Sequence, residues 1–268
     1  MKYDPVKKIF GNLVSDNTFL RKIFYYLLDL MFLRSWHVRK KVRELYPKNT
    51  KMDIFDAGMG FGQYTYFMAK RFPESKILAV DVKDEQVGDC RKFFSATGYN
   101  NVTFEIADLT KINYKDKFDF ILCVDVMEHI AEDELVFKNF SNSLKKGGKL
   151  LVNTPSNLGG SDAEDEDDES FIEEHARVGY SKEDITDKVR RAGLEVESFD
   201  YSYGKFGTIS WKFGIKYPIL IAGASKFFIL LLPFYYIFTL WIVLILMWLD
   251  VRTKNETGTG IVMVAEKK

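Results

Sequence analysis

The sequence predicts an α/β protein built on a mostly parallel sheet, with an apolar helical insertion late in the chain. From residue 51 onward, short apolar runs alternate with amphipathic stretches, which is typical of βαβ units. A glycine-rich turn follows the first of these runs. A stretch without any charged residue, 227–249, interrupts the alternation before a last short apolar run.

The bulk composition narrows the class of protein. A chain of 268 residues fits one large domain or one domain with additions. Equal numbers of basic and acidic residues, 38 of each, argue against a dedicated nucleic-acid-binding protein. The two cysteines, Cys90 and Cys123, match no metal-ligand spacing and are expected to be free thiols in a reducing compartment. The N-terminus shows no secretion signal, so we expect the soluble part to remain in the cytoplasm.

The first fifty residues, 1–50, are predicted to form basic amphipathic helices. Residues 1–51 carry twelve Lys or Arg residues against four acidic residues. Apolar residues recur there at roughly helical spacing, at Phe19, Ile23, Tyr26, Leu27, Leu30, Leu33 and Val38. Two uses of such helices remain open: they can lie on an anionic membrane, or they can pack against the main domain.

The middle of the chain alternates between strands and helices. The predicted strands are 52–57, 76–80, 102–106, 118–124, 148–153 and 195–201, with a last strand at 261–265. The predicted helices are 63–72, 84–97, 132–144 and 182–192. The acidic run 162–169 is too charged to pack and is predicted to be a loop.

The central motif is Asp56-Ala57-Gly58-Met59-Gly60-Phe61-Gly62, between a strand and a helix. Glycines at such a turn let the backbone approach a ligand closely, and the following helix directs free N–H groups toward it. A dinucleotide fold would place its third glycine where Gln63 stands. A carboxylate before the turn repels phosphate but can pair with an ammonium group. S-adenosylmethionine has an ammonium group and no phosphate, so it is the ligand that we expect.

Two further carboxylates are predicted at neighbouring strand ends. Asp81 ends the second strand, where a carboxylate can accept hydrogen bonds from both ribose hydroxyls. Val82 beside it can pack on the adenine ring. Asp108, followed by Leu109, comes after the third strand and can accept a hydrogen bond from the adenine amino group. Each acid alone is often a helix cap, but three at successive strand ends indicate one ligand site at the carboxyl edge of the sheet.

From about residue 53 to residue 202, the chain resembles the class I S-adenosylmethionine-dependent methyltransferases. The resemblance is carried by Asp56-x-Gly58-x-Gly60-x-Gly62, Asp81, Ala107-Asp108-Leu109 and the block Phe118-Asp119-Phe120-Ile121-Leu122-Cys123-Val124-Asp125-Val126-Met127-Glu128-His129-Ile130. That block is most similar to the quinone O-methyltransferase branch. The resemblance implies a Rossmann-like sheet of seven strands with helices on both faces. It also implies that Asp56, Gly58 and Gly60, with Gly62 in the same turn, hold the methionine part, and that Asp81 holds the ribose. Asp108 and Leu109 would hold the adenine, and the Val124 backbone would lie beside the cofactor.

The same branch implies a divalent metal at the D/E-x-x-E-H position, where Asp125, Glu128 and His129 stand. Spacing of three and four residues puts side chains on one face of a helix, and such ligands suit Mg, Mn or Zn. The alternative is a helix start that lines the pocket without metal. If the acceptor is a hydroxyl, it needs a base, for which His129 and His175 are the candidates. His175 is equally well explained as a surface residue.

The apolar insertion, 215–255, can be placed by topology. If the strand 195–201 and the last strand, within 256–268, belong to one sheet, the chain must return to the side of the membrane that it left. Pro233 divides the apolar stretch into halves of 16 residues, each about 24 Å long as a helix at about 1.5 Å per residue. This is short of the roughly 30 Å of a bilayer core. We therefore predict a helical pair that dips into one leaflet; the alternatives are a buried cap and a homodimer interface.

The sequence thus predicts a methyltransferase core at 51–214, attached to the cytoplasmic face of a membrane by its insertion. Its acceptor would be a lipophilic small molecule or lipid, with oxygen favoured over nitrogen or carbon as the methylated atom, and nucleic acid is not an expected partner. A non-catalytic, membrane-anchored assembly protein is the alternative. A nicotinamide-dependent reductase is disfavoured by Gln63.

Overall fold

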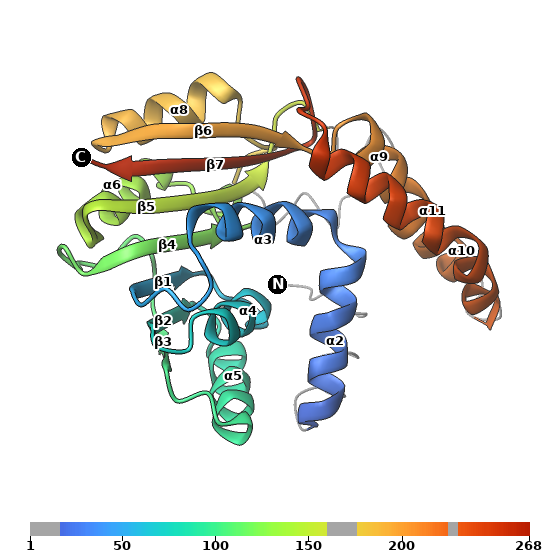
Figure 1. Ribbon diagram of the computed structural model, residues 1–268. Helices are drawn as coiled ribbons and strands as arrows, with labels where there is room; N and C mark the ends of the chain where they lie inside the picture. Colours follow the sequence, from blue (N-terminus) through green and yellow to red (C-terminus); the bar gives the residue numbers. More distant parts are fainter. Residues whose placement is uncertain (1–16, 160–175, 225–229) are drawn as a thin grey trace.

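The seven strands form one sheet in the order β3-β2-β1-β4-β5-β7-β6 (Figure 1). The computed structural model describes residues 17–159, 176–224 and 230–268. The strands are β1 (Asp53–Ala57), β2 (Lys76–Asp81), β3 (Val102–Ile106), β4 (Phe118–Val124), β5 (Leu144–Pro155), β6 (Leu194–Ser202) and β7 (Gly260–Lys267). Among these described strands, β7 alone runs antiparallel to its neighbours, β5 and β6. The predicted fold class is confirmed.

Helices cover both faces of the sheet. They are α2 (Thr18–Met31), α3 (Leu33–Leu45), α4 (Gln63–Arg71), α5 (Asp84–Thr97), α6 (Asp133–Ser143), α8 (Lys182–Arg191), α9 (Lys205–Trp211), α10 (Tyr217–Ala224) and α11 (Leu232–Arg252). A 3₁₀ turn, η1 (Met127–His129), follows β4, and a π-helical segment, η2 (Lys212–Lys216), joins α9 to α10.

The apolar runs of the central strands are buried on both faces, because alternate residues point to opposite sides of the sheet. On one face, Phe55 and Ile121 pack with residues of α6 and α8. On the other face, Ile54 and Phe120 pack with residues of α3, α4 and α5. The two hydrophobic cores fix the strand ends that carry the predicted site.

The N-terminal helices pack against the domain. Arg21 and Tyr25 of α2 are buried, as are Val38 and Val42 of α3. Several basic side chains of these helices form ion pairs, among them Arg34–Asp125 and Lys41–Asp200 with the rest of the domain and Arg39–Asp29 between the two helices. The helices thus pack against the domain, but Phe19, Ile23, Tyr26 and Leu27 of the predicted apolar face are exposed, so contact of this face with a membrane stays a prediction. The predicted acidic loop 162–169 and residues 1–16 lie outside the described residues.

The apolar insertion forms a helical hairpin that projects away from the sheet (Figure 1). One arm is the continuous run α9–η2–α10 and the other is α11. The prediction that Pro233 splits the stretch into equal halves is wrong, because Pro233 lies in the first turn of α11, where proline is tolerated. The second arm is therefore 21 residues long rather than 16. As predicted, the strands before and after the hairpin belong to one sheet, in which they are direct neighbours.

Candidate active site

The glycine turn after β1 is shaped by three residues in the left-handed region, Gly58, Gly60 and Gly62. The backbone N–H groups of Gly58 and Met59 both donate to the Val80 carbonyl, at 2.9 Å each, which ties the turn to β2. A Cβ atom on Gly58 would lie 2.3 Å from a methyl carbon of Val126, whereas one on Gly60 would meet nothing within 4 Å. Gly58 is thus needed for packing, and Gly60 faces open space where a ligand can approach.

Asp81, the last residue of β2, lies directly against this turn. One of its carboxylate oxygens accepts from the Gly60 N–H at 2.9 Å, and the other accepts from the Lys83 N–H at 3.0 Å. Val82 follows with its side chain largely exposed. The structure therefore brings together the predicted glycine turn, the predicted ribose acid and an apolar side chain free to pack on a ring.

Asp56 is buried at the end of β1. Its carboxylate accepts a hydrogen bond from the Thr65 hydroxyl of α4. Burial raises the pKa of Asp56 to about 7, with the Thr65 hydrogen bond opposing this and the nearby charge of Asp81 adding to it. Asp56 thus couples β1 to the helix behind the turn, while its contact with an ammonium group stays a prediction.

Asp108 follows β3 and is held by its own loop. It accepts from the backbone N–H and the hydroxyl of Thr110, at 3.0 Å and 2.7 Å, and pairs with Lys111 at 2.9 Å. The hydrogen bonds from Thr110 and Lys111 lower the pKa of Asp108 to about 2. Leu109 next to it is buried in the core. A bond from the Ala107 N–H to the Asp81 carbonyl, 3.1 Å long, joins the tips of β3 and β2.

The N-terminal helix α2 supports the glycine turn from the side. The Tyr25 hydroxyl and the Arg21 guanidinium both donate to the Phe61 carbonyl, at 2.5 Å and 3.0 Å. Arg21 also donates to the Asp89 carbonyl and to the Cys90 sulfur of α5. This contribution of α2 to the site has no clear signal in the sequence, because Arg21 there belongs to an ordinary basic helix.

The block after β4 does not form the predicted metal site. Asp125 lies before η1 with φ +52°, so Asp125, Glu128 and His129 do not share a helical face. Glu128 is buried and accepts from the Thr154 hydroxyl, whereas His129 is exposed. Among the described residues, no three His, Cys, Asp or Glu side chains are grouped to hold a metal ion. The metal prediction is therefore corrected: a guanidinium, that of Arg34, is the cation that pairs with Asp125.

Of the two predicted bases, His129 is among the described residues and His175 is not. His129 is exposed next to the site, and its role as a base stays a prediction. His175 lies outside the described residues, although its neighbour Ala176 donates to the Glu128 carbonyl at 2.9 Å. Burial raises the pKa of Glu128 to about 8, with a further contribution from the charge of Asp125. Val124, the last residue of β4, is half-buried beside the turn.

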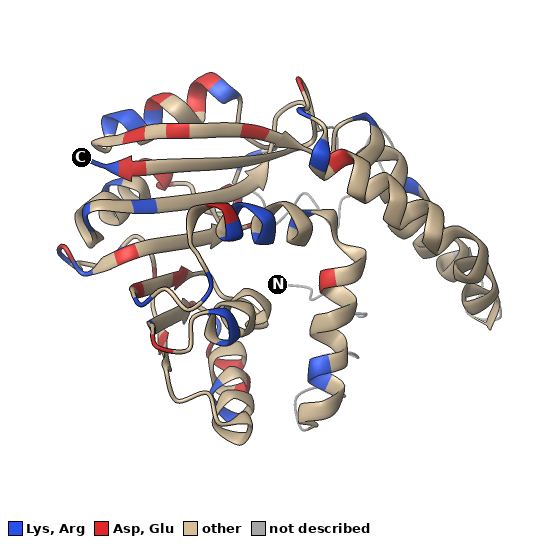
Figure 2. Cartoon of the chain, in the orientation of Figure 1, with Lys and Arg blue, Asp and Glu red and all other residues tan. Residues whose placement is uncertain are grey.

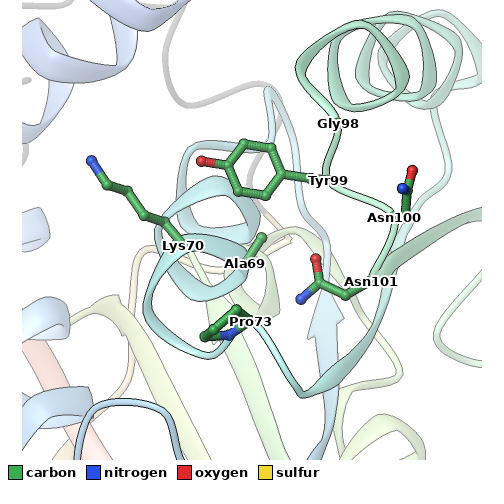
Figure 3. A pocket seen from close by; sticks show the side chains of 7 residues that line it. All are labelled: Ala69, Lys70, Pro73, Gly98, Tyr99, Asn100 and Asn101. Carbon is green, nitrogen blue, oxygen red and sulfur yellow. The ribbon is translucent and has the colours of Figure 1, made fainter.

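A depression elsewhere on the molecule is not part of this site. Lys70, Pro73 and Tyr99 line it with Ala69, Gly98, Asn100 and Asn101 (Figure 3). Ala69 and Lys70 lie in the last turn of α4, Pro73 lies between α4 and β2, and residues 98–101 lie between α5 and β3, so the depression lies at the amino ends of the strands. The acids described above lie at the opposite, carboxyl edge.

Comparisons with known proteins agree with this geometry. A family described as methyltransferase domain matches residues 48–199, more than half of the chain. Phosphoethanolamine N-methyltransferase 3 of Arabidopsis thaliana is 33% identical over 101 residues, which are 37% of this chain and 20% of the relative. The malonyl-[acyl-carrier protein] O-methyltransferase of Bacillus cereus is 25% identical over 143 residues, 53% of this chain and 48% of the relative. The chain thus spans less than half the length of these curated relatives.

Solved structures show the same fold. Phosphoethanolamine N-methyltransferase 2 of Haemonchus contortus, solved with S-adenosyl-L-methionine, aligns with a TM-score of 0.65 at 16% identity, over 96% of this chain and 60% of that chain. At this identity the likeness concerns the fold alone. One of the two curated relatives is named as an N-methyltransferase and the other as an O-methyltransferase. Their names do not single out the quinone O-methyltransferase branch that the sequence favoured.

Proposed function

The chain belongs to the family of methyltransferase domains, and on that premise we propose that it transfers the methyl group of S-adenosylmethionine to a lipid or lipophilic acceptor at a membrane surface. The observation that carries the methyl-donor site is the contact of Gly60 with Asp81 at the tips of β1 and β2. There an open backbone position and a partly exposed carboxylate adjoin each other, as a phosphate-free nucleoside requires.

The residues present fit this donor. Gly60 leaves room for close approach, and the Asp81 oxygens can exchange their bonds to backbone N–H groups for bonds to ribose hydroxyls. Val82 offers an exposed apolar surface for the adenine. The donor supplies an activated methyl group, and the chain supplies orientation, which accounts for much of the rate of an in-line displacement.

The membrane part of the proposal rests on the outer half of the hairpin. Among the described residues, one helix, α11, is long and apolar enough to cross a membrane, with mean hydropathy 2.1 and 11% of its apolar window buried. Phe238 and Trp241 of this helix are 75% and 70% exposed. In Figure 2 the outer parts of α10 and α11 carry no Lys, Arg, Asp or Glu. An exposed apolar surface of this extent is typical of contact with a membrane or a partner.

Charge and topology favour insertion into one leaflet. Both ends of the hairpin return to the sheet, because Ser202 of β6 pairs with Gly260 of β7. Lys212 and Lys216 lie on the first arm, before α10. Beyond them α10 extends by eight residues, about 12 Å at about 1.5 Å per residue, which is less than half of a bilayer core of roughly 30 Å. Lys212 and Lys216 would then lie at the level of the lipid headgroups.

The experiment combines vesicle sedimentation with ligand binding. The double variant Phe238→Glu/Trp241→Glu should leave the vesicle pellet, while the control Leu135→Glu, at an exposed apolar residue of α6, should sediment like the wild type. All three proteins should bind S-adenosylhomocysteine equally. If the double variant still sediments with the vesicles, membrane contact through the hairpin is refuted. If the double variant also changes from a dimer to a monomer, the hairpin is instead a homodimer interface.

Activity is tested separately. Labelled S-adenosylmethionine and a total lipid extract are incubated with the full chain, and the labelled product is identified by mass spectrometry. A labelled lipid supports the proposal. Failure to bind S-adenosylhomocysteine at high micromolar concentration would refute it and favour the non-catalytic assembly protein.

A further inference from the structure

Four side chains that the sequence does not connect meet beside the glycine turn. We call Arg34, Tyr64, Asp125 and Tyr203 the Arg34 cluster. The Arg34 guanidinium pairs with the Asp125 carboxylate. The backbone N–H of Arg34 donates to the Tyr203 hydroxyl at 3.3 Å, and the Tyr64 hydroxyl lies 3.3 Å from the hydroxyl of Ser35.

The Arg34 cluster lies between the methyl-donor site and the hairpin. Tyr64 is the second residue of α4, directly after the glycine turn. Val126, next to Asp125, fills the space above Gly58. Tyr203 comes just before α9 and packs against the group formed by Leu33, Val243 and Met247, which includes two residues of α11. A lipid held at the hairpin would therefore present its headgroup close to the Arg34 cluster.

Two members of the Arg34 cluster have a strained backbone. Asp125 has φ +52° and Tyr203 has φ +55°. The left-handed region costs a non-glycine residue about 1–2 kcal/mol, and a bulky side chain such as tyrosine is rarely found there. Residues held in such conformations cluster at binding and catalytic sites. Both strained residues contact Arg34, Asp125 through the guanidinium and Tyr203 through the backbone N–H, which supports a binding role for the set.

The charges of the Arg34 cluster define what it can bind. The Arg34 and Asp125 side chains are 38% and 28% exposed, so a ligand can reach both. An anion that binds Arg34 would leave the Asp125 carboxylate without its partner. A cation that binds Asp125 would leave the Arg34 guanidinium without its partner. A zwitterion satisfies both charges. The Tyr203 hydroxyl accepts from the backbone N–H of Arg34 and keeps its own proton to donate to an anion. The Arg34 guanidinium suits a phosphate group.

We propose that the Arg34 cluster is the acceptor subsite and that it binds a zwitterionic headgroup, with a phosphate on Arg34 and a primary ammonium on Asp125. This inference rests on the proposed function and names its substrate class. It moves the acceptor atom from the oxygen favoured by the sequence to nitrogen. The ammonium loses a proton to a water molecule, because solvent has access to the partly exposed Asp125 that binds the ammonium. The nitrogen lone pair then forms the new bond to the methyl carbon, and the electrons of the broken carbon–sulfur bond remain on sulfur as the neutral thioether.

The test measures methyl transfer by the full chain from labelled S-adenosylmethionine. The acceptors are vesicles of phosphatidylethanolamine, soluble glycerophosphoethanolamine, and vesicles of phosphatidylglycerol, which has the phosphate but no amine. We expect label on the amine of the first acceptor and none on the third. If glycerophosphoethanolamine is labelled at an equal rate, the substrate is still a zwitterion, but it is a soluble phosphoamine and not a lipid.

Variants separate binding from structure. Arg34→Gln and Asp125→Asn should each raise the KM for phosphatidylethanolamine at least tenfold, with a smaller change in kcat, and Arg34→Lys should recover part of the loss. Asparagine also tolerates the left-handed region, so the second change leaves the backbone in place. The matched control is Arg191→Gln, which removes an exposed ion pair with Glu134 on the far helices and should behave as wild type.

The results show which of the two proposals fails. If the wild type does not bind S-adenosylhomocysteine, the proposed function and this inference are both refuted. Normal binding of that compound with equal KM values for Arg34→Gln and Arg191→Gln would refute the inference alone. Normal binding with transfer to an uncharged lipid, and none to phosphatidylethanolamine, would do the same.

Discussion

The imidazole of His37 and the carboxylate of Asp250 lie 2.8 Å apart, although 213 positions separate them in the chain. His37 belongs to α3 and Asp250 to the last turns of α11. The second oxygen of Asp250 accepts from the Gly207 N–H of α9 at 2.9 Å. One fully buried carboxylate therefore joins both arms of the hairpin to the N-terminal helices at the root of the hairpin.

Replacement of Asp250 should destabilise the fold. Asp250→Ala leaves His37 and the Gly207 N–H without their partner, and breaking a buried pair typically costs about 3–5 kcal/mol. Urea unfolding of the detergent-solubilised protein would measure the change in the free energy of unfolding. The control Asp200→Ala removes a more exposed carboxylate paired with Lys41 and should cost less than about 1 kcal/mol. Equal losses for the two variants would contradict the anchoring role.

The glycine turn predicts a contrast between two neighbouring substitutions. Gly58→Ala places a methyl group against Val126 and should destabilise the fold strongly. The methyl group of Gly60→Ala meets no atom, so this change should cost only the strain of a positive φ, about 1–2 kcal/mol, while lowering the affinity for S-adenosylhomocysteine at least tenfold.

Gly98→Ala is the control for Gly60→Ala. Gly98 also has a positive φ and open space around its Cα, but it caps α5 at the other edge of the sheet. Calorimetric titration should show wild-type affinity for this variant. A Gly60→Ala protein that binds as well as Gly98→Ala would show that the ligand does not approach the turn there.

Asp81 should control donor binding. Asp81→Ala removes the acceptor expected to hold both ribose hydroxyls and also releases the Gly60 N–H. Loss of two charge-assisted hydrogen bonds should weaken S-adenosylhomocysteine binding by an order of magnitude or more. Asp116→Ala, at a largely exposed residue paired with Lys267, should bind normally in the same titration. Unchanged affinity in Asp81→Ala would place the ribose elsewhere.

The raised pKa of Asp56 predicts how stability depends on pH. Its folded-state pKa of about 7 lies above the ordinary 3.8, so between these values the folded protein binds more protons than the unfolded chain. The contribution of Asp56 to stability is therefore present at low pH and is lost as pH rises from about 4 to about 7. At about 1.4 kcal/mol per pKa unit the loss is of the order of 4 kcal/mol.

Asp56→Asn tests this dependence because it keeps an acceptor for Thr65 without the charge. The decline in the free energy of unfolding across that pH range should become shallower, with a remainder due to Glu128, whose pKa is also raised. Asp116→Asn should retain the wild-type curve. An unchanged slope in Asp56→Asn would mean that this carboxyl group does not titrate over the range.

The sequence predicted the strands well because their apolar runs are buried on both faces, and the order of runs and turns specifies the sheet. It predicted that Asp81 and the glycine turn lie at the same edge of the sheet, since parallel strands end there, but not the hydrogen bond between Gly60 and Asp81. It could not predict the Arg34 cluster, whose members come from α3, α4, the end of β4 and the start of the hairpin. It was also wrong about the residues after β4: the spacing predicted one helical face for Asp125, Glu128 and His129, whereas Asp125 takes a positive φ and a 3₁₀ turn follows.

The place of β7 in the sheet has a consequence for biosynthesis. β6 reaches the rest of the sheet only through β7, yet the whole hairpin lies between these strands in the chain. Since a chain is synthesised from its N-terminus, the apolar arms of the hairpin leave the ribosome while the edges of β5 and β6 still lack their shared neighbour, β7. β7 can therefore pair only after the whole hairpin has been made, and a nascent chain delayed before that stage would expose open strand edges and the apolar arms together.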